Sequence, residues 1–291
     1  MSDLSAEAIA AALTTRRLGR PVLYFPRTGS TNDVAHERAA AGATEGLLVI
    51  ADEQTAGRGR LDRRWWAPPG SSLLMSLLLR PALPPDRAGQ LTMCLGLAAV
   101  EAIEAVTRLR PALKWPNDLL LEDRKLGGML TELRLEGERL EYAVLGLGVN
   151  VNVAFDEGRH LHPPAVAAGA VTTEDQDDSS FVIRHSSDLA NTAISLSMVM
   201  GHPVDRLALL AALLARCEAW YERALAGESP HAAWAARLDT VGRRVTVATT
   251  TGSVAGMAVG VTPEGALLVR DDDAAEHVIW SGDVTALRRA E

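Results

Sequence analysis

The spacing of apolar and polar residues predicts alternating strands and helices along most of the chain. Apolar runs of strand length occupy residues 47–51 and 72–79. A longer, almost continuous run at 142–153 is typical of a fully buried central strand. Between these runs, apolar positions recur at helical spacing. The predicted helices cover roughly residues 4–18, 32–41, 88–109 and 204–225.

Two further strands are expected at 119–121 and 128–133, joined by a tight connection at 122–125. Strands and helices in this order predict an α+β fold, with a central mixed β-sheet flanked by helices. Residues 154–190 contain Pro-Pro and an acidic run and show no periodicity, so we expect a long mobile insertion there.

The pattern changes beyond residue 240, where short strands follow one another at hairpin spacing and predict a small β-barrel. We therefore expect two domains, a larger one over residues 1–235 and a C-terminal one over 236–291. The four strands expected in the tail are residues 245–247, 256–261, 267–269 and 277–280.

The composition is that of a soluble globular protein, with 47% hydrophobic and 23% charged residues in 291. Acidic residues precede the first short apolar run, which is unlike a signal peptide. No uninterrupted apolar stretch approaches the roughly 20 residues of a membrane span. Cys94 and Cys217 lie in apolar helical patterns, which is typical of reduced core thiols. We therefore expect a cytoplasmic protein that does not contact a membrane.

The formal net charge of −8 argues against a nucleic-acid surface spread over the whole protein. The charge is uneven, however, because residues 57–65 hold Arg58, Arg60, Arg63 and Arg64 against a single acid. A basic cluster in an acidic protein indicates one local anionic ligand rather than a long polyanion.

Residues 57–60 read Gly-Arg-Gly-Arg. The glycines allow close approach of backbone N–H groups to a ligand, and the guanidinium groups suit phosphate or carboxylate. A basic surface turn would have the same four residues. The flanking residues 53–56 and 63–65 favour a binding loop, because the longer string matches a known pattern.

Residues 114–118 read Lys-Trp-Pro-Asn-Asp and predict a turn that carries a cation, an aromatic ring and two polar groups. The alternative is a purely structural turn with Trp115 in the core. Lys125 precedes two glycines at 127–128 and can neutralise a phosphate or carboxylate as a point charge. An isolated hairpin lysine is, however, usually solvated.

Residues 146–152 place glycines in a buried strand, which would let a flat ligand lie against the sheet. They end a strand and lack the spacing of a dinucleotide-binding loop. The sequence has no Walker A, G-x-S-x-G or paired C-x-x-C motif. Its histidines show no metal-ligand spacing, so no protein-bound metal is predicted.

Taken together, five ordered motifs resemble the bacterial biotin–protein ligase family. The resemblance implies a class II synthetase-like catalytic domain followed by an SH3-like β-barrel. The motifs are residues 28–32, 54–60, 114–119, 124–128 and 146–150.

The family joins biotin to a lysine of a biotin carboxyl carrier protein in two steps. The biotin carboxylate attacks the α-phosphate of Mg-ATP, giving biotinyl-5'-AMP and pyrophosphate, and the carrier lysine then displaces AMP. The resemblance therefore implies biotin and ATP as substrates, Mg²⁺ as cofactor and a carrier protein as partner. A carboxylate is ionised at pH 7, so the enzyme needs no activated serine or cysteine. It must supply positioning and positive charge around the phosphates.

The resemblance also assigns roles to the matching residues. Those expected to bind biotin are Ser30, Thr31, Asn32, Gln54, Arg58, Gly59, Arg60 and Lys125. Those expected to bind ATP and the adenylate are Arg58, Arg60, Arg63, Trp65, Asn117, Lys125 and Asn150. The expected catalytic residues are Arg60, Lys125 and Asp118. Asp118 would orient or deprotonate the incoming lysine, because that amine is mostly protonated at pH 7.

The chain departs from the family pattern at Leu61 and Asp62, where members often carry a basic residue and a glycine. Too few residues precede Ser30 for the N-terminal DNA-binding domain of the members that repress transcription, so we expect the form without it. The alternatives are a lipoate or octanoyl ligase of similar fold, a DNA-binding repressor, and a biotin-binding protein that has lost catalysis. A monomer and a homodimer are both compatible with the sequence.

Overall fold

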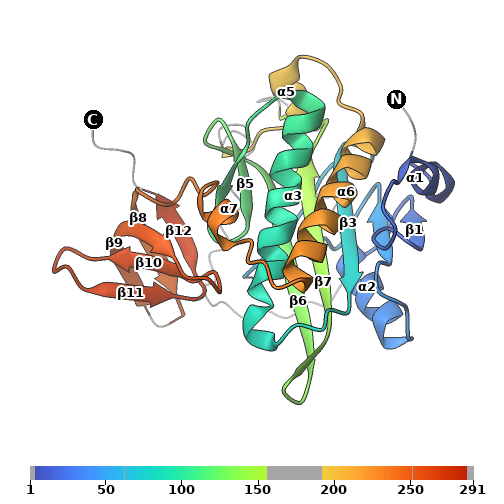
Figure 1. Cartoon of the computed structure of the whole chain (residues 1–291). Coiled ribbons are helices and arrows are strands. Elements are labelled where there is room, and N and C mark those ends of the chain that lie inside the picture. Colours follow the sequence, from blue (N-terminus) through green and yellow to red (C-terminus); the bar gives the residue numbers. More distant parts are fainter. Residues whose placement is uncertain (1–3, 62, 156–191, 251, 287–291) are drawn as a thin grey trace, which may run out of the picture.

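The computed structural model describes residues 4–61, 63–155, 192–250 and 252–286. The insertion expected at 154–190 lies almost wholly outside these ranges, and so does Asp62. The described residues form a seven-stranded sheet with helices, followed by a separate five-stranded sheet (Figure 1). The predicted combination of a helix-flanked sheet and a small C-terminal β-unit is confirmed.

The seven-stranded sheet is mixed, as predicted, because β1 and β2 are parallel whereas the other neighbouring strands are antiparallel. The longest strands lie at its centre, and β3 has the predicted bounds. In their order across the sheet the strands are β1 (Val22–Phe25), β2 (Leu48–Ala51), β3 (Ser72–Leu79), β7 (Arg139–Asn150), β6 (Arg124–Glu136), β5 (Asp118–Leu121) and β4 (Ala112–Lys114).

Two long helices, α3 (Gly89–Thr107) and α6 (Arg206–Leu225), pack on one another and cover one face of this sheet (Figure 1). The shorter α2 (Thr31–Ala40) packs against β2, β3 and β7 through a separate apolar cluster. The shorter helix therefore lies on the opposite face of the sheet. The remaining helical elements are α1 (Ala6–Ala12), η1 (Pro85–Arg87), α5 (Leu196–Met200) and α7 (His231–Ala235).

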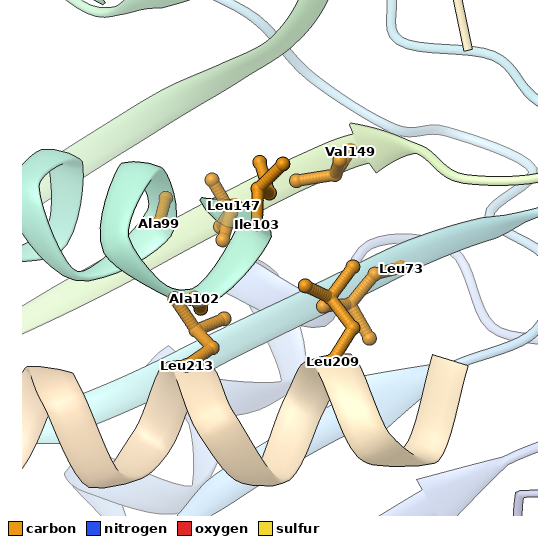
Figure 2. Close-up of a pocket in the computed structure, with 8 residues that line it drawn as sticks. All are labelled: Leu73, Ala99, Ala102, Ile103, Leu147, Val149, Leu209 and Leu213. Carbon is orange, nitrogen blue, oxygen red and sulfur yellow. The ribbon is translucent and has the colours of Figure 1, made fainter. Parts of the chain in front are cut away.

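The core between α3, α6 and the sheet is mostly apolar. It contains a small pocket whose lining offers no polar side chain, so it suits packing rather than a polar ligand (Figure 2). Cys94 and Cys217 are buried free thiols in this core, as predicted, and burial raises the pKa of Cys94 to about 12. The pocket is lined by Leu73, Ala99, Ala102, Ile103, Leu147, Val149, Leu209 and Leu213.

The segment Pro85–Thr107 is long and apolar enough to cross a membrane by length and mean hydropathy, the one such helix among the described residues. Polar positions divide this segment, so it contains no uninterrupted apolar run of that length. In the structure 67% of its apolar window is buried inside the protein, as in the core helix of a folded domain.

The second sheet contains five strands in the order β11-β10-β9-β8-β12, one more than predicted. The strand Asp283–Ala286 was not predicted, because four residues are too few to show a clear alternation of apolar and polar positions. Trp115 Nε1 donates to Gly265 O at 2.8 Å and joins this sheet to the first. The bounds are β8 (Arg244–Thr249), β9 (Gly252–Val261), β10 (Leu267–Arg270), β11 (Glu276–Ile279) and β12 (Asp283–Ala286).

The helix predicted over residues 4–18 is wrong in length, because α1 ends at Ala12. Backbone N–H groups of Arg16, Arg17 and Leu18 instead donate to the Glu218 carboxylate at 2.7–2.8 Å. A partner about 200 positions away in the sequence thus satisfies the groups that a longer helix would have paired internally.

The connection predicted at 122–125 is also too long. The turn consists of Glu122 and Asp123, whose φ values of 53° and 58° are those of a two-residue hairpin turn of type I′. Strand β6 therefore begins at Arg124, and Lys125 is a strand residue rather than a loop residue.

Candidate functional site

The predicted site residues gather on the sheet face opposite α3 and α6. They come from the start of α2, from residues 53–66 and from the facing positions of β3, β5, β6 and β7. Ser76, Gly146 and Leu130 lie side by side across three strands, and so do Leu74, Gly148 and Gly128. Residues paired across a sheet share a face. These two rows are therefore the floor of the site.

Four polar residues form a cluster at one end of this floor, which we call the buried amide cluster because Thr31, Asn32 and Ser76 are buried, whereas Gln54 is half-buried. Gln54 Oε1 accepts from Thr31 N at 2.6 Å and from Thr31 Oγ1 at 3.0 Å. Ser76 Oγ lies 2.7 Å from Thr31 Oγ1 and 2.5 Å from Asn32 Oδ1. Ser30 is the N-cap of α2, but its side chain makes no capping bond.

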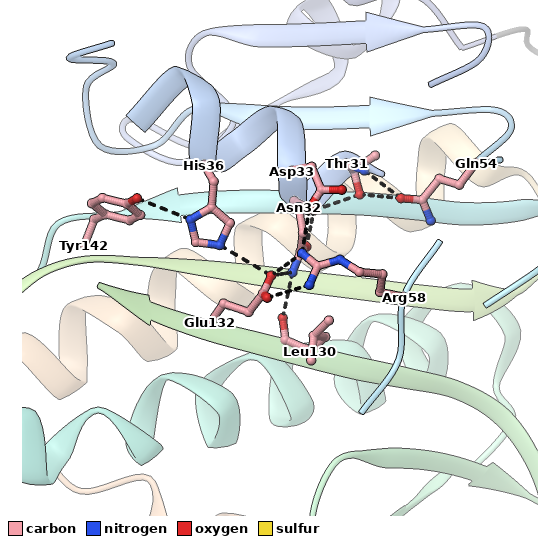
Figure 3. Close-up of polar contacts among 10 residues, drawn as sticks. Thr31, Asn32, Asp33, His36, Gln54, Arg58, Leu130, Glu132 and Tyr142 are labelled. Carbon is pink, nitrogen blue, oxygen red and sulfur yellow. Dashed lines mark hydrogen bonds and ion pairs between the residues drawn. The ribbon is translucent and has the colours of Figure 1, made fainter. Parts of the chain in front are cut away.

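Asn32 extends the cluster toward the loop (Figure 3). Its Nδ2 amide donates to Leu130 O at 3.3 Å and to Glu132 Oε2 at 2.7 Å. Glu132 also accepts two hydrogen bonds from Arg58, and Asp33 accepts a third at 2.6 Å. The guanidinium of Arg58 is thus held by two carboxylates, on α2 and β6.

The strand glycines were predicted to let a flat ligand lie against the sheet, and this interpretation needs correction. A Cβ at Gly146 would lie 2.3 Å from Asn32 Oδ1, and one at Gly148 would lie 2.7 Å from Trp65 Cε2. Both values are far below van der Waals contact. The missing side chains therefore make room for Asn32 and Trp65, which themselves rest on the sheet.

Residues 57–61 and 63–65 form a tight turn whose two ends meet. Trp65 N donates to Gly57 O at 2.9 Å, Gly59 N donates to Arg63 O at 2.7 Å, and Arg63 N donates to Arg60 O at 3.2 Å. Leu61 at the tip has a φ of 54°, in the left-handed region. This geometry places Arg60 and Arg63 on a compact turn, which we call the arginine turn.

Arg60, Lys125 and Asp118 form a charged cluster at the other end of the floor. Lys125 Nζ donates to Asp118 Oδ1 at 2.7 Å, and Arg60 donates to Asn117 Oδ1 at 3.4 Å. Partial burial lowers the pKa of Arg60, although the charges of Asp118 and Asp283 act in the opposite direction.

Lys125 reaches this cluster because of a β-bulge. The register of β5 and β6 shifts between Leu119 and Leu120, so that Leu120 pairs with Lys125 whereas Leu119 pairs with Gly127. Without the extra residue, strict alternation from Gly128 would turn Lys125 toward α3. The bulge places it on the same side as Asp118.

The second sheet also reaches the site. Arg63 donates two hydrogen bonds to the carboxylate of Asp283, the first residue of β12. Burial opposes ionisation of Asp283, but the hydrogen bonds and charge of Arg63 outweigh it and lower the pKa of this carboxyl. The arginine turn is thereby attached to the C-terminal sheet.

Trp65 lies between the two clusters. Its ring centroid is 6.0 Å from Lys125 Nζ. Its Nε1 is buried and has no hydrogen-bond partner among the described residues. An unpaired buried donor costs about 1–3 kcal/mol, which a ligand acceptor at this position would offset.

Asn150 is buried at the end of β7, where its Nδ2 donates to Ile194 O at 3.2 Å. Ile194 N in turn donates to Lys125 O at 3.0 Å. The structure therefore links Asn150 to the backbone of the charged cluster through Ile194, rather than placing its side chain among the charged groups.

Four residues of the site were missed by sequence reasoning: Asp33, Ser76, Glu132 and Asp283. A serine inside the apolar run of β3 was a usable signal, since a buried hydroxyl needs a partner. Glu132 and Asp283 gave no local signal. Among the residues that the structure describes, no group of three His, Cys, Asp or Glu side chains could hold a metal ion.

Comparison with known proteins identifies the family. Residues 24–150 match the biotin/lipoate A/B protein ligase family, and residues 240–285 match the biotin protein ligase C terminal domain. The fold is similar to that of the solved biotin protein ligase of Aquifex aeolicus in complex with biotin and ATP, with a TM-score of 0.69. The two sequences are 24% identical, and the match covers 92% of this chain and 99% of that one.

Curated relatives extend the match over nearly the whole chain. The bifunctional ligase/repressor BirA of Bacillus spizizenii is 32% identical over 97% of this chain and 78% of its own length. The biotin–[acetyl-CoA-carboxylase] ligase of Mycobacterium tuberculosis is 33% identical over 90% of this chain and 87% of its own. On these matches and on the site described above, the chain belongs to the biotin–protein ligase family.

Proposed function

We propose that this protein is a biotin–protein ligase, which converts biotin and ATP to biotinyl-5'-AMP and transfers the biotin to a lysine of a biotin carboxyl carrier protein. The observation that carries the proposal is the pairing of two clusters on one sheet face. A neutral hydrogen-bonding cluster suits an uncharged polar ring, and a cationic cluster beside it suits phosphates.

The buried amide cluster would recognise the ureido head of biotin. Thr31, Asn32 and Gln54 of the cluster, with the neighbouring Ser30, offer hydroxyl and amide groups that can both donate and accept hydrogen bonds, as a urea requires. Gly59 on the loop brings the backbone close to the ligand. Because the cluster residues are already hydrogen-bonded to one another, binding would need little reorganisation.

In the first step the biotin carboxylate attacks the α-phosphorus of ATP, the bond from that phosphorus to the bridging oxygen breaks, and pyrophosphate leaves. Arg60, Arg63 and Lys125 would neutralise the charge that develops on the phosphate oxygens. Trp65 would line one side of the adenine site, and Asn117 and Asn150 would lie near the nucleotide.

In the second step the carrier lysine attacks the acyl carbon of the adenylate, an amide forms and AMP leaves. The attacking amine must first lose a proton. Asp118 is our candidate for orienting or accepting it. This carboxylate accepts a hydrogen bond from Lys125, so it would act after the phosphate has drawn Lys125 away.

Mg²⁺ would arrive bound to the phosphates of ATP and would neutralise part of their charge. Such ions usually take one or two protein carboxylates in addition to phosphate oxygens. Asp118 and Asp283, which both face Arg60, are of the right chemistry for that contact. The chain itself would still position the reactants.

We further propose a domain boundary near residue 236, a cytoplasmic location, and a carrier domain of a biotin-dependent carboxylase as partner. The names of the relatives support the carboxylase partner, since one is a biotin–[acetyl-CoA-carboxylase] ligase. We propose no nucleic-acid or membrane partner, and either a monomer or a homodimer.

The decisive experiment is pyrophosphate release that depends on both biotin and ATP. We expect release with biotin, none with lipoate, and transfer of label to a carrier domain that has its target lysine. Binding of biotin without pyrophosphate release would reduce the protein to a binder. Preference for lipoate in calorimetric titration would replace the proposal with the lipoate alternative, which the family model by itself also covers.

A further inference from the structure

Arg58 is bound by carboxylates of α2 and β6, whereas Arg63 binds Asp283 of the second sheet and Arg60 donates to the neutral Asn117. Arg58 NH1 lies 2.9 Å from Glu132 Oε1, and its NH2 lies 3.0 Å from Glu132 Oε2 and 2.6 Å from Asp33 Oδ1. A guanidinium that binds one carboxylate through both nitrogens is firmly oriented. It points toward α2 and β6, where these two acids are located (Figure 3).

The same Glu132 carboxylate also orients Asn32. Glu132 Oε2 accepts from Asn32 Nδ2 at 2.7 Å, which leaves Asn32 Oδ1 facing Ser76 Oγ. His36 Nε2 lies 3.4 Å from the same oxygen. One side chain on β6 therefore connects the loop to the buried amide cluster.

The position of Glu132 on the strand explains how it reaches both. Thr131 faces α3, where its hydroxyl bonds Thr92 at 2.8 Å, so Glu132 faces the other side of the sheet. Burial opposes its ionisation, but hydrogen bonds from Asn32 and Arg58 outweigh this and lower the pKa of the carboxyl. The group is therefore ionised at neutral pH.

We propose that Glu132 is a positioning residue that anchors the loop at residues 57–61 and 63–65 through Arg58 and at the same time holds the amide of Asn32. Arg58 is then the anchor of the loop rather than a phosphate ligand. Arg60, which donates to the neutral Asn117, remains for the substrate anions, and Arg63 would join it once a phosphate replaces Asp283 as its partner. This inference rests on the proposed function for its catalytic readouts.

The first test needs no activity. The loop contains arginines at 58, 60, 63 and 64, so trypsin cleavage there reports how firmly it is held. In Glu132→Gln we expect cleavage within the loop to be about tenfold faster than in the unaltered protein, measured by mass spectrometry of early fragments. The matched control is Glu141→Gln, a β7 carboxylate that pairs with Arg134 at 3.8 Å. Its loop cleavage should be unchanged.

The second test measures the adenylate. In Glu132→Gln, biotin binding should weaken and biotinyl-adenylate should dissociate faster, each about tenfold. The rate of pyrophosphate formation at saturating biotin and ATP should fall less than about threefold. Arg58→Met should show the same pattern, and the double variant should be no worse than either single one, as expected for one shared interaction.

Two results would overturn the inference. Loop cleavage in Glu132→Gln as slow as in the control would show that this carboxylate does not hold the loop. A loss of about a hundredfold in pyrophosphate formation in Arg58→Met alone would show that Arg58 acts on the phosphates. Failure of the proposed function would look different, because the unaltered protein would then form no adenylate while the trypsin result still stood.

Discussion

The two ends of the site floor solve different binding problems. In the buried amide cluster, Ser76 is 0%, Thr31 3% and Asn32 5% exposed. In the charged cluster the side chains of Lys125 and Asp118 are 38% and 20% exposed. One end is neutral and shielded, and the other is ionic and in contact with water.

This difference follows from the chemistry that each end would meet. Buried neutral groups that satisfy one another form a rigid network, which suits a head group that keeps its structure throughout the reaction. Ions must stay partly hydrated to avoid a large desolvation cost. Partial exposure also allows their partners to change, as required when pyrophosphate and later AMP depart. The following predictions test this contrast, from the largest expected effect to the smallest.

Removing Lys125 from the charged cluster should have the largest effect on the rate of pyrophosphate formation. We expect Lys125→Ala to slow pyrophosphate formation by about a hundredfold, the usual scale for one preorganised electrostatic contact, with a change of only a few-fold in biotin affinity. Arg124→Ala is the matched control, because the neighbouring Arg124 pairs with Glu122 across the turn. Equal losses in both variants would contradict a specific role for Lys125.

Breaking the neutral end should affect stability and biotin binding together. Asn32→Ala leaves Ser76 and Glu132 without their amide partner, so we expect about 1–3 kcal/mol less unfolding free energy and at least about tenfold weaker biotin binding. Denaturant titration and calorimetry measure the two effects. Asn152→Ala, which removes an amide paired with the backbone of Val204, should lower stability without weakening biotin binding.

Loosening the arginine turn should separate binding of biotin from retention of the adenylate. In Arg60→Gly we expect unchanged biotin affinity, release of the adenylate about tenfold faster, and more biotin on non-cognate lysines. The labelling of a bystander protein measures the escape. Adenylate retention equal to that of the unaltered protein would show that the turn is not a lid.

Acid should weaken the connection between the two ends slightly. The pKa of Glu132 is lower in the folded protein than in the unfolded chain, so its stabilising contribution is present above about pH 4.3 and is lost as the pH falls further. The melting temperature should therefore decline less steeply in Glu132→Gln than in the unaltered protein between about pH 5 and pH 3. Parallel curves would indicate no such coupling.

Local patterns were sufficient for most of the fold. The apolar run at 72–79 predicted β3 with its observed bounds, and helical spacing at 88–109 predicted α3 at Gly89–Thr107. Each element can be predicted from its own periodicity, because its apolar positions are the ones that become buried in the core. The residues that the motifs named also lie together on one face of the sheet. The roles of the individual residues remain predictions.

Interactions distant in sequence were not predictable. Glu218 accepts a hydrogen bond from the backbone of Arg16, about 200 residues away in the sequence. Asp283 binds Arg63 from the other sheet. No periodicity encodes such a pair, because each partner is an ordinary surface-type residue in its own segment.

The sequence by itself determined the kinds of groups present at the site, the strands and helices that carry them, and the family to which the chain belongs. The tertiary structure decided which groups are paired with one another. It turned Lys125 onto the site through a bulge, filled the space above Gly146 and Gly148 with Asn32 and Trp65, and placed Glu132 between Arg58 and Asn32. The physical reason is that strand register and facing depend on hydrogen bonds between strands, which no single strand contains.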